Sequence, residues 1–213
     1  FITLAGVADV NGDGLDDVLL QNSRSFAGTN TNPGVAWVAF GKKDAATISV
    51  SAIEAGSYGF AINAGLDTAA SGAYSGAYSV ASAGDVNGDG LGDLIVTHVT
   101  ANPLITWAGS AYVVYGKTDG SMVNLSNIAP SLGFRILGAS VNDYLGTSAA
   151  GAGDINGDGF DDIIVGAGWA NPGNPARADA GMTYVTTVEH RLTAVRSSRL
   201  PMATPSAQLV TIL

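Results

Sequence analysis

Cysteine is absent from the 213-residue chain, and charged residues make up only 13% of it. The lack of cysteine excludes a disulfide-stabilised scaffold and thiolate metal sites. No apolar run approaches the roughly 18 residues of a membrane-spanning helix, so we predict no membrane span. The chain opens at Phe1 without a signal-like segment, and we therefore expect it to be a piece of a longer or processed protein.

What the chain does have is 46% hydrophobic residues and 29 glycines, a composition that favours short strands joined by tight turns. The formal net charge of −9 argues against a nucleic-acid partner. Half of the 18 acidic residues occupy matching positions of three short loops, where a multivalent cation could neutralise them. Three divalent ions would change the formal charge from −9 to −3, since −9 + 6 = −3.

The three acidic loops belong to an internal repeat, which decides the architecture. They recur at spacings of 76 and 69 residues. Their sequences are Asp9-Val-Asn-Gly-Asp-Gly-Leu-Asp-Asp17, Asp85-Val-Asn-Gly-Asp-Gly-Leu-Gly-Asp93 and Asp154-Ile-Asn-Gly-Asp-Gly-Phe-Asp-Asp162.

Strand patterns surround each loop in the same order. A small-residue strand precedes the loop, an apolar run follows it, and an alternating strand comes after a longer segment with an Asn-Pro pair. The first strands are Leu4 to Ala8, Val80 to Gly84 and Ala149 to Gly153; the second are Val18 to Leu20, Leu94 to Val96 and Ile163 to Val165; the third are Val35 to Phe40, Ala111 to Tyr115 and Met182 to Val185. Fourth strands are predicted at Tyr58 to Ile62 and Phe134 to Leu137, and the third unit has no obvious counterpart.

Repeated units of four antiparallel strands indicate an all-β fold of β-propeller-type blades, with about three blades forming a partial or oligomer-completed propeller. We expect blade 1 at residues 1–63, blade 2 at 64–138 and blade 3 at 139–185. Strand alternation places the acidic loops on one face and the Asn-Pro loops on the other. Since propellers close with about four to eight blades, the missing ones come either from a longer chain or from a homo-oligomer.

The segment 186–213 departs from the repeat, because it contains no glycine and holds three of the nine basic residues. It is interpreted as a divergent tail. Two explanations stay open: an outer strand near Gln208 to Ile212, or a remnant foreign to the fold.

The acidic loops have the ligand chemistry of a calcium site. Calcium takes six to eight oxygen ligands, several of them charged, on a backbone that turns tightly. Positions one, three, five and nine offer side-chain oxygens, position seven offers a carbonyl, and glycines at four and six allow positive φ. The predicted ligands of three Ca²⁺ ions are Asp9, Asn11, Asp13, Leu15, Asp17, Asp85, Asn87, Asp89, Leu91, Asp93, Asp154, Asn156, Asp158, Phe160 and Asp162.

The competing interpretation is a tight hairpin turn, for which Asn-Gly-Asp-Gly is well suited. It explains the glycines but gives no reason for an aspartate at position nine. An EF-hand is excluded because its twelfth position needs a bidentate Glu, where this chain has Leu20, Val96 and Val165. Asp16 and Asp161, at position eight, are interpreted as solvated side chains because Gly92 replaces them in the second loop.

On these loops the chain resembles the FG-GAP repeats of the integrin α-subunit N-terminal β-propeller, which are also found in bacterial exported proteins. The family's Phe-Gly tag is approximated by Leu145-Gly146 and its Gly-Ala-Pro tag by Gly166-Ala167-Gly168. The resemblance implies a seven-bladed ring with calcium on the lower face and partner binding on the upper face. It also implies an extracellular or cell-surface location.

No catalytic centre is predicted, and we do not expect an enzyme. The two histidines, His98 and His190, are isolated, and the chain has no nucleophile elbow, zinc-protease helix or phosphate loop. FG-GAP repeats do accompany catalytic domains in some exported hydrolases, so a non-catalytic accessory region remains an alternative.

The expected function is adhesion, through binding of a protein or glycan on the face opposite calcium. A calcium-stiffened structural or assembly scaffold is the other alternative. Exposed-looking residues in the Asn-Pro loops could form the binding patch, or their rings could instead pack between blades. These residues are Arg24, Phe26, Trp107, Trp169 and Arg177.

Overall fold

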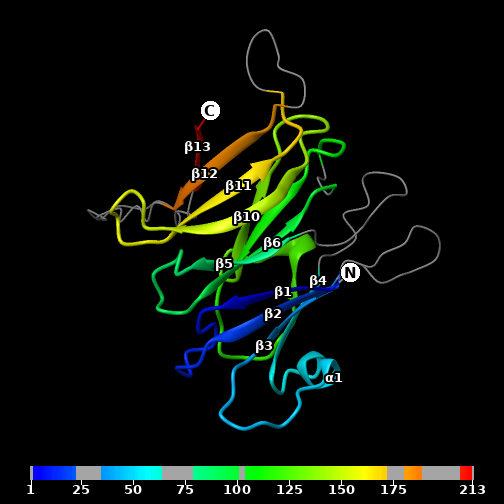
Figure 1. Cartoon of the computed structure of the whole chain (residues 1–213), viewed down its shortest axis with the longest axis vertical. Coiled ribbons are helices and arrows are strands. Elements are labelled where there is room, and N and C mark those ends of the chain that lie inside the picture. Colours follow the sequence, from blue (N-terminus) through cyan, green and yellow to red (C-terminus); the bar gives the residue numbers. More distant parts are fainter. Residues whose placement is uncertain are drawn as a thin grey trace, which may run out of the picture.

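The computed structural model describes residues 2–22, 35–63, 79–100, 104–171, 180–188 and 207–212. Within them the chain is almost entirely β-structure, in three antiparallel sheets packed in chain order (Figure 1). The predicted all-β fold of propeller-like blades is confirmed. In this part of the chain, no helix has the length and apolar character needed to cross a bilayer.

Each sheet is built around four antiparallel strands, most of them from one sequence unit. The first consists of β1 (Ile2–Val7), β2 (Asp17–Asn22), β3 (Val35–Ala39) and β4 (Gly59–Asn63). The second consists of β5 (Val80–Gly84), β6 (Asp93–His98), β7 (Ser110–Val114) and β9 (Gly133–Leu137). The third consists of β10 (Leu145–Gly153), β11 (Asp162–Ala167), β12 (Met182–Val188) and β13 (Ala207–Ile212).

The fourth strand of the third sheet comes from the segment interpreted as a divergent tail. β13 pairs antiparallel with β12 from Thr183↔Ile212 to Val188↔Ala207, so the explanation of an outer strand is the one the structure supports. A second crossing of the expected unit boundaries is β8 (Val123–Asn124), which pairs parallel with β4 at the edge of the first sheet. A short strand of blade 2 thereby pairs with the outer strand of blade 1.

Two short helices were not expected from the sequence. α1 (Val50–Glu54) begins at Ser49, whose hydroxyl accepts the N–H of Ala52 at 3.2 Å. It packs on β3 and β4 and buries only Ile53. η1 (Leu125–Asn127) follows β8, with the side chain of Asn124 accepting the N–H of Ser126. Both helices lie in connections and leave the order of the strands unchanged.

Two apolar cores lie between the sheets, one at each junction. The first joins the inner face of sheet one, including Leu19, Val38 and Phe60, to Leu94 and Tyr112 of sheet two. The second joins the opposite face of sheet two to the third sheet. It includes Ile95, Val113, Leu145, Ile163 and Val165. Since each sheet buries its faces against its neighbours, burial of apolar area between blades is the main stabilising contribution.

The acidic loops share one side of the molecule, as predicted. They connect β1 to β2, β5 to β6 and β10 to β11, and Figure 1 shows them one above another along the same edge of the three sheets. The connections from β6 to β7 and from β11 to β12 leave the strands at their other ends, because neighbouring strands run antiparallel.

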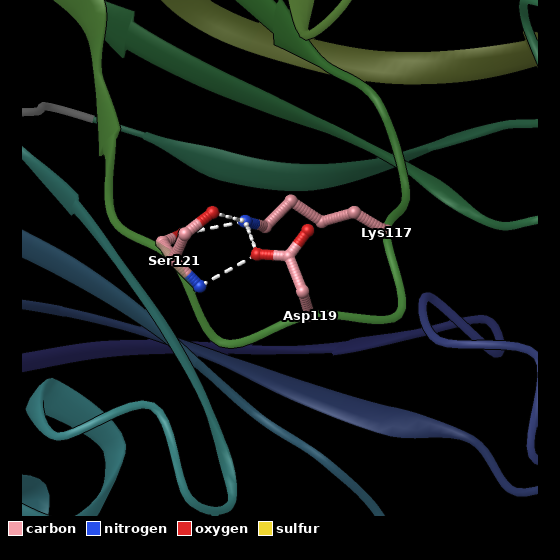
Figure 2. Close-up of polar contacts among 3 residues, drawn as sticks. All are labelled: Lys117, Asp119 and Ser121. Atoms are coloured by element: carbon pink, nitrogen blue, oxygen red, sulfur yellow. Dashed lines mark hydrogen bonds and ion pairs between the residues drawn. The ribbon is translucent and has the colours of Figure 1, made fainter.

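A buried lysine ties the second blade to the first. Lys117 is 7% exposed, and its Nζ donates to Asp119 Oδ1 at 2.8 Å and to the hydroxyl and carbonyl of Ser121 (Figure 2). The ammonium also lies 4.9 Å from the ring centroid of Phe60 in β4, and the Lys117 N–H donates to Val10 O at 2.8 Å. The pKa of Asp119 is lowered, first by its hydrogen bond to Lys117.

Lys42 provides a matched control for this contact, because it occupies the same place after β3, pairs with Asp44 at 2.8 Å and lies 5.9 Å from the Tyr58 ring centroid, but its side chain is 23% exposed. We expect Lys117→Met to lower the free energy of unfolding by about 1–3 kcal/mol, through lost charge-assisted hydrogen bonds and the lost ring contact. Lys42→Met should change it by less than about 1 kcal/mol. Urea unfolding of the two variants measures the difference, and equal losses would contradict a bridging role for Lys117.

Candidate metal centre

The first aspartate of each acidic loop accepts backbone N–H groups from the following residues, which wrap around its carboxylate. Asp9 Oδ1 accepts the N–H groups of Gly12 at 2.6 Å and Asp13 at 3.1 Å, and its Oδ2 accepts that of Gly14 at 2.7 Å. Asp85 and Asp154 repeat all three bonds. The pKa of Asp154 is lowered, chiefly by the N–H of Gly159. These bonds favour the ionised form of the Asp154 carboxylate in the third loop.

The glycines at positions four and six adopt the conformation expected of them. Gly12 and Gly14 have φ of 79° and 85°, and the pairs in the other two loops lie between 74° and 92°. These values bring three successive N–H groups to one side of the loop, where the first aspartate accepts them.

Positions three and five pair with each other at the exposed side of the loop. Asn11 Oδ1 accepts the N–H of Asp13 at 2.9 Å, and its amide donates to Asp13 Oδ2 at 3.0 Å. The other oxygen of Asp13 accepts the N–H of Leu15 at 2.9 Å. The same three bonds recur in the second and third loops, at Asn87, Asp89 and Leu91 and at Asn156, Asp158 and Phe160.

The ninth aspartate is buried and has a structural function that the sequence argument did not foresee. Asp17, Asp93 and Asp162 open the second strand of each sheet, and each accepts the N–H of position two through Oδ2. Oδ1 of Asp17 accepts Gly41 N–H at 2.7 Å, and Oδ1 of Asp93 accepts Gly116 N–H at 2.8 Å. The ninth side chain thus closes each loop, and in the first two blades it also bonds to the backbone just after the third strand.

Burial raises the pKa of Asp93 to about 7, and the negative charges of Asp89 and Asp85 add to the rise. The pKa of Asp17 is also raised, first by burial and then by the charges of Asp13 and Asp9. In these two loops the three carboxylates therefore act on one another electrostatically.

The loops contain oxygen donors of the kind that calcium binds. In this structure their side chains form hydrogen bonds with the loop backbone. In the described residues, which include all three loops, no group of three or more His, Asp or Glu side chains is arranged to hold a metal ion. Their carboxylate oxygens accept loop N–H groups. The donor set fits calcium by its chemistry, since it consists of oxygen alone and carries three carboxylates that repel one another.

The third unit matches a known family. The sequence model of the FG-GAP repeat covers residues 145–186, which span β10, the acidic loop, β11 and most of β12. Residues 145–186 are an FG-GAP repeat. No curated protein matches the chain. The first and second units share the loop, its hydrogen bonds and the strand order with this FG-GAP repeat.

The interpretation of Asp161 as a solvated side chain is wrong. In the FG-GAP repeat its Oδ2 accepts the N–H of Asp85 in the preceding loop at 2.9 Å, and its own N–H donates to Asp85 O at 3.1 Å. Position eight therefore belongs to the contact between blades. Gly92 replaces the side chain in the second loop and still donates its N–H to Asp9 O at 2.7 Å.

Two of the aromatic residues predicted for a binding patch, Trp107 and Trp169, both contact the ring of Tyr144. The Tyr144 ring stacks with Trp107 at a centroid distance of 6.2 Å and contacts Trp169 at 5.3 Å. Trp169 is 49% exposed. Tyr144 was missed because it lies just before β10, outside the Asn-Pro loops. Arg24, Phe26 and Arg177 lie outside the described residues.

His98 is the last residue of β6 and is 3% exposed. It extends the buried strand opposite Ser110 of β7. His190 lies outside the described residues.

The raised pKa of Asp93 predicts a specific pH dependence in calcium-free buffer. Between the ordinary carboxyl pKa and about 7, the folded state keeps a proton that the unfolded state releases. Stability from this group therefore falls as pH rises from about 4 to 7, by at most about 1.4 kcal/mol per pH unit. Urea unfolding with a chelator measures the slope.

Asp93→Asn is the control, because it removes the titrating group whatever its effect on overall stability. The difference in unfolding free energy between wild type and this variant should change with pH in the stated direction. A difference that stays constant from about pH 4 to 7 would show that Asp93 titrates normally.

Proposed function

We propose that the three acidic loops bind Ca²⁺ and that this segment is a calcium-stabilised binding module of an exported or cell-surface protein. FG-GAP repeats are typical of extracellular and cell-surface proteins, which supports this location. Calcium would serve as a structural ion, held by the side chains of positions one, three, five and nine and the carbonyl of position seven. No catalytic activity is proposed for the segment.

The observation that carries the proposal is the common bonding pattern of three loops with the same acidic donors. Burial raises the pKa of the carboxylate at position nine in two of the loops, and the nearby carboxylates at positions five and one add to the rise. A cation is the natural relief for such repulsion. Oxygen donors of this number favour calcium over magnesium, which keeps several waters, and over zinc, which prefers nitrogen and sulfur.

Calcium should raise the stability of the whole arc. With dissociation constants of ~0.1 to 1 mM, as for extracellular modules, ~2 mM calcium contributes roughly 0.6 to 1.8 kcal/mol per site. We expect a chelator to lower the melting temperature, calcium to restore it and magnesium to be much less effective. Scanning calorimetry measures these shifts.

The loop variant Asp89→Asn should lower the calcium stoichiometry by one in isothermal calorimetry. Asp44→Asn is the control, since Asp44 is an exposed carboxylate outside the loops. A melting temperature that the chelator does not change would contradict the calcium proposal.

A group formed by Trp107, Tyr144 and Trp169 supports partner binding on the side away from the acidic loops. The loops that carry the first two rings are joined by backbone bonds from Tyr144 N to Trp107 O and from Leu145 N to Ala108 O. Trp107, Asn142 and Tyr144 are the non-glycine residues with positive φ in the described chain, and all three lie in these loops. Such strain concentrates at functional sites.

Partner binding through these rings predicts a separation between affinity and stability. Trp169→Ala should weaken binding to a glycan array or to immobilised extracellular proteins at least about tenfold, because buried Trp anchors dominate interfaces. Its melting temperature should change little, since the side chain is half exposed.

Tyr58→Ala is the matched control, because Tyr58 is also half exposed and lies in the first unit, outside this group. Unfolding of Trp169→Ala with no separate effect on binding would assign the ring to packing between blades instead.

A further inference from the structure

Neighbouring blades meet in the same register at both junctions within the chain. At the first junction Gly92 N–H donates to Asp9 O at 2.7 Å, and at the second Asp161 N–H donates to Asp85 O at 3.1 Å. Each bond runs from position eight of one acidic loop to position one of the preceding loop. The position-seven side chain also covers the position-four glycine of the preceding loop at both junctions. These shared contacts place the blades alike, and the residues beside them distinguish one junction from the other.

At the second junction, a glycine of blade 2 makes room for an aspartate of blade 3. Gly84 is the residue immediately before the second acidic loop. A Cβ on Gly84 would lie 2.6 Å from Cγ and 2.8 Å from Cβ of Asp161. Oδ2 of Asp161 accepts the N–H of Asp85, the residue that follows this glycine, at 2.9 Å. The aspartate therefore occupies the space that the absent side chain leaves, and it bonds to the backbone there.

At the first junction the two sizes are reversed. Ala8 precedes the first acidic loop, as Gly84 precedes the second, and position eight of the following blade is Gly92. A Cβ on Gly92 would lie 2.8 Å from the Ala8 Cβ and 3.1 Å from the Ala8 carbonyl carbon. A methyl group and a backbone carbon have no rotamer by which they could move aside. An aspartate at position 92 therefore does not fit against Ala8 in this register.

The backbone before the loop differs in step with these side chains. β5 has a register shift just before Gly84, whose φ is 80°, and β10 has one before Gly153, whose φ is 67°. β1 pairs with β2 in regular register up to Val7. A bulge with glycine at positive φ bends a strand and re-aims the groups that follow it. In β5 the group that follows is the N–H of Asp85, which bonds to blade 3.

We propose that the residue before each acidic loop and the position-eight residue of the following blade form a matched pair that decides which blades can dock. In each pair one member carries a side chain and the other is glycine. Ala8 and Gly92 match blade 1 to blade 2. Gly84 and Asp161 match blade 2 to blade 3. The blades are therefore not interchangeable, although their loops and strand orders are alike.

Each possible mismatch has a physical penalty. An aspartate against Ala8 is overpacked, which destabilises a well-packed contact. A glycine against Gly84 leaves a gap and removes the charge-assisted bond to the Asp85 N–H. None of the four paired residues is a predicted calcium ligand, so the proposal does not rest on calcium binding.

Installing the second pair at the first junction tests the proposal. Gly92→Asp alone should lower the urea midpoint of the full chain, because the new side chain meets Ala8. Adding Ala8→Gly should recover at least about half of that loss, since the effect of one paired residue depends on the other. Ala5→Gly, the same change three residues earlier, is the matched control and should give no recovery. All variants are unfolded in one calcium-containing buffer.

The second junction gives the converse measurement. Asp161→Gly should lower the urea midpoint, because the Asp85 N–H loses its carboxylate acceptor. Gly84→Ala should also lower it, through the positive φ and the displaced carboxylate. Since the two changes act partly on one contact, the loss from Gly84→Ala should be smaller in the Asp161→Gly background than in the wild type. Losses that simply add would contradict a matched pair.

The outcome at the first junction decides the proposal. If Gly92→Asp fails to fold, recovery of a folded chain on adding Ala8→Gly, verified by circular dichroism, is the expected result in another form. Three outcomes would overturn the proposal: a Gly92→Asp chain as stable as the wild type, a double variant no more stable than Gly92→Asp, or equal recovery with Ala5→Gly.

Discussion

The architecture of each blade depends on one buried carboxylate, the ninth residue of its acidic loop. In the first two blades this side chain accepts one N–H from the loop and another from a glycine two residues past the end of the third strand. Three strands are therefore fixed relative to the loop by a single group. An ionised carboxylate is costly to bury without such donors. The buried aspartate and the glycine that donates to it are therefore needed in the same blade.

The position of the loop in turn sets how blades stack. Once position nine is fixed, position eight directs its N–H to the preceding loop and position seven lays its side chain over a glycine. The sheets behind them bury apolar faces on each other. Local hydrogen bonding and interblade packing thus share the same nine residues, so the two junctions of the stack are alike.

Much of the blade architecture could be predicted from the sequence, because the same pattern of residues occurs three times. Strand order, the positive φ of Gly12 and Gly14 and the common side of the loops all follow from local chemistry. The partner of Asp17 could not be predicted, since Gly41 lies 24 residues away. Asp161 was misread because its contact lies in the preceding blade. The outer strand near Gln208 to Ile212 stayed one of two explanations, because this segment lacks the turn residues of the other units, and β13 confirms it.

On the proposed function, calcium and blade stacking are thermodynamically coupled. The residues that would hold the ion alternate with those that contact the neighbouring blade, so an ion that orders the loop also orders the seven and eight positions. Ordering them beforehand lowers the conformational entropy lost on docking. Coupling of this kind is reciprocal. A docked blade therefore raises the calcium affinity of the loop it covers.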